Sequence, residues 1–218
     1  MIIKEIFEAP QWNRSEIARY AKADDSDERI SALIESCIIE SEPLLEYRVC
    51  YTIDDIVRTD HSIKFCGIDT SSSLIKKAVS GCENILLFAA TIGAQFDRLI
   101  AKYSRLEPSK ALILQAIGAE RIESLCDAFC EKMNTELHPS KKSLRPRVSP
   151  GYGDIELKMQ QEIFKVLDCE RKIGLTLNES LLMSPSKSVT AMAGIGAYRC
   201  LEHNKCDSCA NTGCSYRK

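Results

Sequence analysis

The feature that most constrains the fold is a long amphipathic segment that begins at Pro108 and ends near Leu137. Apolar positions recur along it at spacings of three and four, which predicts one helix with an apolar stripe on one side. Such a stripe must be covered, so we expect this helix to pack on a sheet. The acidic residues of the segment lie largely outside the stripe, which comprises Leu114, Ile117, Arg121, Leu125, Phe129 and Met133.

A second constraint is the unbroken apolar run Asn84-Ile-Leu-Leu-Phe-Ala-Ala-Thr91, which is typical of a strand buried on both faces. Alternating or β-branched runs predict further strands at 46–53, 63–68, 173–177 and 188–194. Capping residues and apolar spacing predict helices that begin near Asn13, Ser71, Gly93 and Asp154. Helices and strands are thus interspersed, as in a mixed α and β domain.

Composition excludes several classes of protein. The formal net charge of −2 gives no basic face for nucleic acid, and no run of about 18 apolar residues predicts a membrane span. The first residues lack the apolar core of a signal peptide. Eleven cysteines without such a signal indicate a reducing, cytoplasmic location, where thiols serve as core residues, metal ligands or reactive groups.

Two ordered motifs carry the functional information. The first is Arg147-Val-Ser-Pro-Gly-Tyr-Gly153, and the second runs from Thr176 through Glu179, Met183 and Pro185 to Val189. Taken alone, an arginine followed by Pro-Gly-Tyr-Gly is more often a simple turn. Arginine can also bind a carboxylate through its planar fork, and glycine allows a backbone to approach a ligand closely.

Together the motifs resemble the activation domain of cobalamin-dependent methionine synthase, in which R-x-x-x-G-Y precedes T-x-E-S-x-x-M-x-P-x-x-S-V. The resemblance covers roughly residues 45–197 and implies an α+β fold, a twisted antiparallel sheet with packed helices. It also implies a site for S-adenosylmethionine. No glycine-rich loop follows an early strand, which argues against an ordinary Rossmann methyltransferase.

The resemblance assigns site residues one by one. Arg147 would bind the ligand carboxylate, with Gly151 and Tyr152 beside it, the tyrosine offering a ring to the sulfonium or the adenine. Glu179 would contact the ammonium group or line the face toward the corrin, and the alternative is that it caps the turn at Ser180. Ala193 and Gly194 occupy positions where the family has aromatic residues, so backbone contacts to the nucleotide are kept and aromatic packing is lost. The family also uses an acidic residue that we do not place in this sequence.

The implied function is reactivation. In this family cob(II)alamin is reduced by one electron from a flavodoxin-like donor and is then methylated by S-adenosylmethionine. The cobalt is the nucleophile in that step, so we predict no catalytic residue in the protein. The D-x-H-x-x-G signature of a cobalamin module is absent, since His61 lies in Asp60-His-Ser. We therefore expect action in trans on a cobalamin-binding methionine synthase, in methionine biosynthesis. The alternatives are reactivation of another corrinoid methyltransferase system and a non-catalytic adaptor for a corrinoid protein.

The C-terminal residues add a cysteine pattern. We divide the chain into a helical segment (1–44), the activation-domain-like core (45–197) and a cysteine-rich tail (198–218). The tail spacing C-x5-C-x2-C-x4-C can supply four thiolates to zinc or to an iron–sulfur cluster, and the alternative is a tail of reduced thiols. His203 is a possible substitute for one of the four ligands, which are Cys200, Cys206, Cys209 and Cys214.

Overall fold

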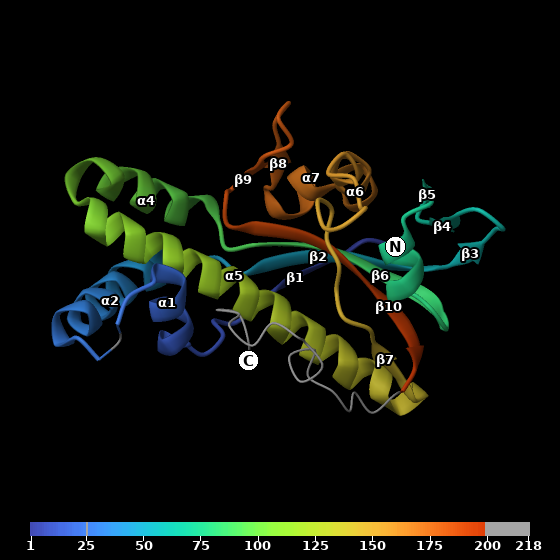
Figure 1. Cartoon of the computed structure of the whole chain (residues 1–218), viewed down its shortest axis with the longest axis horizontal. Coiled ribbons are helices and arrows are strands. Elements are labelled where there is room, and N and C mark those ends of the chain that lie inside the picture. The colour runs from blue at the N-terminus through green and yellow to red at the C-terminus, as the bar shows by residue number, and fades with distance from the viewer. Residues whose placement is uncertain (25, 199–218) are drawn as a thin grey trace.

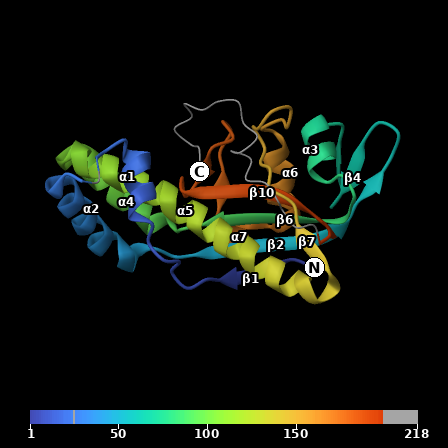
Figure 2. The same cartoon turned by 60° about the horizontal axis from the view of Figure 1, so that its bottom comes forward.

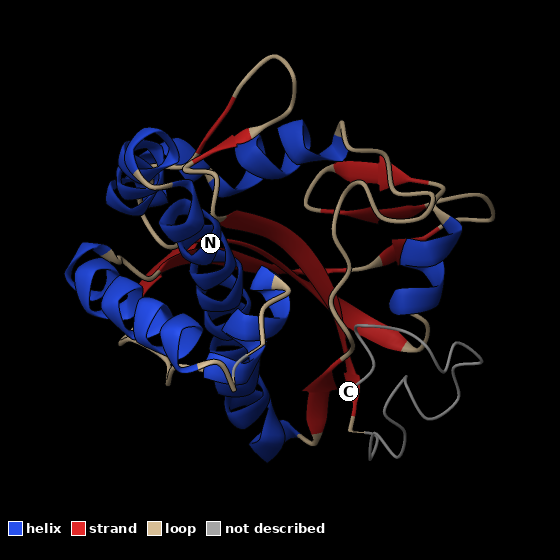
Figure 3. Ribbon diagram, turned by 60° about the vertical axis from the view of Figure 1, so that its left-hand side comes forward, coloured by secondary structure: helices blue, strands red, loops and turns tan. Residues whose placement is uncertain are grey.

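The computed structural model describes residues 1–24 and 26–198, and its centre is a five-stranded antiparallel sheet in the order β1-β2-β6-β10-β7 (Figure 1). The sheet is twisted and curls around its own long axis (Figure 3). The predicted α+β fold is therefore confirmed. The strands are β1 (Ile3–Ile6), β2 (Arg48–Asp55), β6 (Cys82–Thr91), β7 (Lys142–Leu144) and β10 (Ser188–Ala197).

The middle strand β6 is buried on both faces, as its sequence predicts. Ile85 and Leu87 belong to the core on one side of the sheet, while Leu86 and Phe88 belong to the core on the other side. All four side chains are fully buried. The two-residue period of a strand thus divides one apolar run between two hydrophobic cores.

One face of the sheet is covered by the predicted long helix, α5, which crosses the strands obliquely (Figure 2). The ring of Phe129 on α5 packs between Phe88 and Tyr51 of the sheet, with ring centroids 5.0 and 5.1 Å away. The other helices on this face pack on one end of α5. The four helices are α1 (Arg14–Ala21), α2 (Glu28–Ser41), α4 (Ala94–Leu106) and α5 (Pro108–Leu137).

The opposite face is covered by shorter elements, which lie in the chain between β2 and β6 and between β7 and β10. Ile163 and Leu167 of α6 and Ile173 of α7 are buried against this face. A small hairpin, β8–β9, leads from this layer into β10 and projects from the body of the molecule (Figure 1). The elements are α3 (Ser73–Ala78), α6 (Met159–Leu167), α7 (Cys169–Ile173), β8 (Thr176–Leu177) and β9 (Met183–Ser184).

The prediction of one strand over residues 63–68 is wrong. The segment forms two short strands joined by a tight turn, in which Cys66 and Gly67 have φ values of 50° and 78°. Left-handed backbone conformations reverse the chain, so the run ends after three residues. The resulting three-stranded sheet contains β3 (Val57–Arg58), β4 (Ile63–Phe65) and β5 (Ile68–Thr70).

The N-terminal residues are packed into the same body. β1 pairs with β2, and α1 packs on α5. In the described part of the chain, 3₁₀ turns also follow α2, at Glu42–Leu44, and α5, at His138–Ser140. The division of the chain at residues 44 and 197 remains a prediction.

Among the helices that the structure describes, none is both long and apolar enough to cross a membrane.

Candidate functional site

The first motif runs antiparallel beside the sheet strand β10. Val148 and Met192 exchange two backbone hydrogen bonds, each 2.9 Å long. In an antiparallel pair this register places Arg147 opposite Ala193. Ala193 belongs to the core beneath α5, so both residues lie on the sheet face that α5 covers. The pairing with β10 thus turns the arginine of the motif toward the long helix.

Arg147 forms two ion pairs with carboxylates of α5. Its Nη1 atom lies 2.6 Å from Oδ1 of Asp127, and its Nη2 atom donates to Glu123. The two acids are one helical turn apart and therefore project from the same side of α5. The guanidinium is mostly shielded from solvent, since the Arg147 side chain is 24% exposed. One fixed cation thus stands between two carboxylates at the surface.

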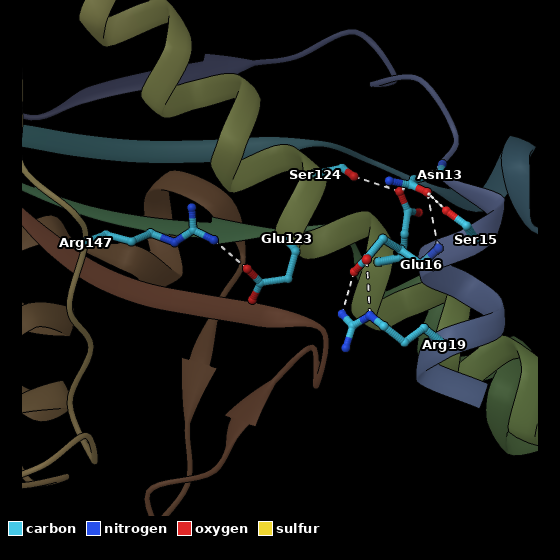
Figure 4. A network of polar contacts seen from close by, with 8 residues as sticks. Asn13, Ser15, Glu16, Arg19, Glu123, Ser124 and Arg147 are labelled. Atoms are coloured by element: carbon cyan, nitrogen blue, oxygen red, sulfur yellow. Dashed lines mark hydrogen bonds and ion pairs between the residues drawn. The ribbon is translucent and has the colours of Figure 1, made fainter. Parts of the chain in front are cut away.

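The three charged groups line a cleft of about 280 Å³ between α5 and α1. The α1 wall carries an ion pair of its own, in which Nε of Arg19 donates to Glu16 at 3.1 Å. Figure 4 shows Arg147 reaching toward Glu123 at one side and the Asn13–Arg19 network at the other. Both signs of charge are therefore present within one small cleft.

A buried ion pair holds the α1 wall in place. The side chains of Glu120 and Arg121, neighbours on α5, are 2% and 0% exposed. Arg121 donates to the backbone oxygens of Pro10 and Gln11, both at 2.7 Å, and stacks over Trp12. The expectation that the acids of α5 lie outside the core is thus wrong for Glu120, because the neighbouring guanidinium compensates its charge.

Glu120 also reaches the start of α1. It accepts hydrogen bonds from the N–H of Asn13, at 3.2 Å, and from the hydroxyl of Ser124, at 2.7 Å. Asn13 in turn caps α1 by accepting the N–H of Glu16. A single buried carboxylate thereby joins α5 to the helix that forms the far wall of the cleft.

The rest of the first motif forms a tight turn outside the cleft. Gly151 adopts a φ of 86° and donates its N–H to Ile155 at 2.8 Å. Tyr152 is 73% exposed and does not line the cleft. Asp154 accepts hydrogen bonds from the hydroxyls of Ser72 and Ser73, and from the N–H groups of Ser73 and Leu74 at the start of α3. These hydrogen bonds, with those from the hydroxyls the strongest cause, hold the pKa of the Asp154 carboxyl well below its usual range. The turn is thus anchored to the body of the protein.

Glu179 and Gly194 are not brought to the Arg147 cleft. Glu179 lies exposed in the loop between β8 and β9, where the side chain of Asn178 accepts the N–H of Leu182 and so closes the turn. Gly194 lies on the other side of β10 from Ala193, because successive strand residues face opposite ways. A Cβ atom there would lie 2.7 Å from the sulfur of Cys82. Its glycine is therefore explained by close packing.

Sequence reasoning missed Glu123, Asp127 and the α1 wall. The available signal was the pair of acids four residues apart on a predicted helix, outside its apolar stripe. Nothing in the local pattern indicates that Arg147, twenty residues beyond Asp127, lies against that pair. Contacts of this kind depend on how α5 crosses β10.

Within residues 1–24 and 26–198, no group of three or more histidine, cysteine and acidic side chains is arranged to hold a metal ion. Cys126 and Cys130 lie on α5, and burial raises the pKa of both thiols. They therefore remain protonated near neutral pH, which disfavours metal binding. The predicted tail ligands Cys200, Cys206, Cys209 and Cys214 lie outside the residues that the structure describes.

Comparison with known proteins identifies a family and similar solved structures. The family described as "Vitamin B12 dependent methionine synthase, activation domain" matches residues 57–197. The fold is similar to a crystal structure of the MetH reactivation domain bound to AdoHcy, with a TM-score of 0.66 and 15% sequence identity over 89% of this chain and 78% of that one. A search of curated protein sequences returns no significant match.

Proposed function

Because the chain belongs to the vitamin B12 dependent methionine synthase activation domain family, we propose that it binds S-adenosylmethionine and presents the methyl group to a corrinoid protein. The supporting observation is the cleft in which Arg147 stands between Glu123 and Asp127. The amino-acid end of the ligand carries a carboxylate and an ammonium group. A guanidinium fork suits the first and an acidic side chain suits the second.

The chemistry of the ligand fits these residues. S-adenosylmethionine supplies an electrophilic methyl group, and the corrinoid of the partner supplies the nucleophile. The protein then contributes position and charge, since holding two reactants in a fixed geometry can lower a barrier without any group of the protein reacting. Arg147 would orient the amino-acid end, while Glu123 or Asp127 would exchange its contact with Arg147 for one with the ammonium group.

A binding experiment tests this proposal directly. S-adenosylmethionine is titrated calorimetrically into the wild type, into Arg147→Ala and into Arg98→Ala. Arg98 lies exposed on α4, outside the cleft, and serves as the matched control. We expect binding by the wild type and the control, and at least a tenfold loss for Arg147→Ala, since hydrogen bonds between charged groups contribute about 1.5–3 kcal/mol. Absence of binding by a folded wild type would instead favour the adaptor role.

The partner and electron donor belong to the same proposal. We propose that the corrinoid is carried by a separate protein, a cobalamin-dependent methionine synthase or another corrinoid methyltransferase, and that a flavodoxin-like protein supplies the electron. The test mixes this protein with cobalamin-loaded methionine synthase, a reductant and methyl-labelled S-adenosylmethionine. Transfer of label to the corrinoid is expected, and it should fail with Arg147→Ala.

For the tail we propose a bound zinc ion or iron–sulfur cluster held by Cys200, Cys206, Cys209 and Cys214. Metal analysis and visible absorption of the full chain, beside a Cys206→Ser/Cys209→Ser variant, distinguish zinc, a cluster and free thiols. We also propose a cytoplasmic location. The seven cysteines of the described residues are all free thiols, which supports a reducing compartment.

A further inference from the structure

A larger cavity, of about 690 Å³, adjoins the Arg147 cleft and follows the C-terminal half of α5. Asp127 lines both spaces, and Glu131 lines the larger one, one helical turn further on. Asp127 pairs with Arg147, whereas Glu131 has no ion pair with any residue that the structure describes. The lysine of the lining, Lys142, already pairs with Glu83 at 2.8 Å. The cavity therefore contains a carboxylate without a partner.

The described part of the chain ends at the rim of this cavity. Tyr198, the last described residue, lines the cavity, and its ring packs edge to face on His138 with centroids 5.9 Å apart. The N–H of Tyr198 donates to the backbone oxygen of Lys141 at 2.7 Å, which fixes the point where the chain leaves the sheet. Residues 199–218 therefore begin beside the cavity.

These twenty residues have the length and the charge to cover the cavity. Asp127 lies about 16 Å from His138 along α5, at a rise of 1.5 Å per residue, and even a random coil of twenty residues spans about 25 Å. The segment contains four basic and two acidic side chains, in a chain that has 29 basic and 31 acidic ones in all. Three of the four flank the cysteines, so metal binding by the thiolates leaves them available. The basic residues are Arg199, Lys205, Arg217 and Lys218.

We propose that residues 199–218 dock over this cavity, with their basic side chains against Asp127 and Glu131. A tethered segment meets its site at an effective concentration in the millimolar range, so contacts too weak to hold a free peptide can keep it docked. Because Asp127 also lines the ligand cleft, the docked segment competes with the ammonium group of S-adenosylmethionine. This competition rests on the proposed function, whereas the docking itself does not.

Zero-length cross-linking tests the docking in the full chain, without any ligand. A water-soluble carbodiimide joins a lysine amine to a carboxylate where the two are in contact, and mass spectrometry of the digest identifies the pair. We expect Lys205 or Lys218 to link to Asp127 or Glu131. Glu162, an exposed acid of α6 on the opposite face of the sheet, is the control acid. Equally frequent links to Glu162, or links only between isotope-labelled and unlabelled copies of the chain, would overturn the proposal.

The thiol of Cys130 gives an independent readout, because this half-buried side chain lines the cavity. Reversing three charges of the segment should release it and raise the alkylation rate of Cys130 about threefold, as loss of exposed ion pairs does. Cys66, also half-buried but at the β4–β5 turn, should keep its rate. Equal Cys130 rates in the wild type and in both variants would overturn the docking. The segment variant is Lys205→Glu/Arg217→Glu/Lys218→Glu, and the control, at exposed positions outside the cavity, is Lys4→Glu/Arg98→Glu/Lys158→Glu.

Calorimetry separates this proposal from the proposed function. We expect the segment variant to bind S-adenosylmethionine about threefold more tightly than the wild type and the control variant do, because the competing cations are gone. Unchanged affinity in a chain that does cross-link would overturn the competition. If the folded wild type binds no S-adenosylmethionine, the proposed function is overturned, while the cross-links and the Cys130 rates still decide whether the segment docks.

Discussion

The guanidinium of Arg147 and the carboxylate of Asp127 form an ion pair, with Nη1 and Oδ1 2.6 Å apart. Arg147 belongs to the segment that pairs with β10, and Asp127 belongs to the helix that crosses above it. The pair therefore joins the two structural layers at the mouth of the cleft. A zwitterionic ligand can replace this ion pair with two others, one between its carboxylate and Arg147 and one between its ammonium group and Asp127.

We expect Asp127→Asn to weaken S-adenosylmethionine binding about fivefold. The substitution removes a charged partner for the ligand ammonium, and the effect is moderated because the Asp127 side chain is 64% exposed. Calorimetry measures it, with Glu136→Gln, an exposed acid on the same helix, as control. Equal affinities for Asp127→Asn and the control would contradict the role of Asp127.

The buried pair on α5 should govern stability. Arg121→Met leaves the Glu120 carboxylate buried without its partner, and we expect a loss of about 3–5 kcal/mol in the free energy of unfolding. Urea denaturation measures this, and Trp12, the only tryptophan of the chain, reports locally because Arg121 stacks on it. Arg98→Met on the surface should cost less than about 0.5 kcal/mol. A similar small cost for Arg121→Met would show that α1 docks without the pair.

Asp154 should make stability depend on acidic pH. Its folded-state pKa lies below the unfolded value of about 4, so the carboxylate stabilises the fold fully above that value. The contribution is lost as the pH falls toward the folded-state pKa. We expect Asp154→Asn to melt about 2–4 °C below the wild type at pH 7, as for loss of a helix cap, and the gap to narrow below pH 4. A gap that stays constant down to pH 3 would rule out the carboxylate as its source.

Gly194 should prove to be a packing residue. An alanine Cβ would lie 2.7 Å from the sulfur of Cys82 and 3.2 Å from the backbone of Ala78 and Val79. We expect Gly194→Ala to cost about 1–3 kcal/mol in stability, as overpacking does, with ligand affinity unchanged. Adding Cys82→Ala should recover part of the loss, because it removes the nearest atom. Lower affinity at unaltered stability would instead support a binding role for Gly194.

Local sequence patterns predicted much of the framework. The period of the apolar stripe identified α5, and the unbroken apolar run identified β6. A helix that is buried on one side repeats apolar residues every three or four positions, and a strand that is buried on both faces has apolar residues at every position. The strand over residues 63–68 was wrong because Cys66 adopts a left-handed conformation that its side chain does not indicate. The burial of Glu120 was missed because its compensating charge, Arg121, was counted as part of the stripe.

By itself the sequence determined most of the elements, α5 and β6 above all, and, through its two motifs, the family. Only the tertiary structure decided that Arg147 meets Glu123 and Asp127. It also decided that Ala193 lies on the sheet face beneath α5 and that Gly194 lies on the opposite face. The physical reason is that motif residues acquire their surroundings from strand register and from the angle at which α5 crosses the sheet. Both depend on contacts between residues far apart in the chain, which no local pattern records.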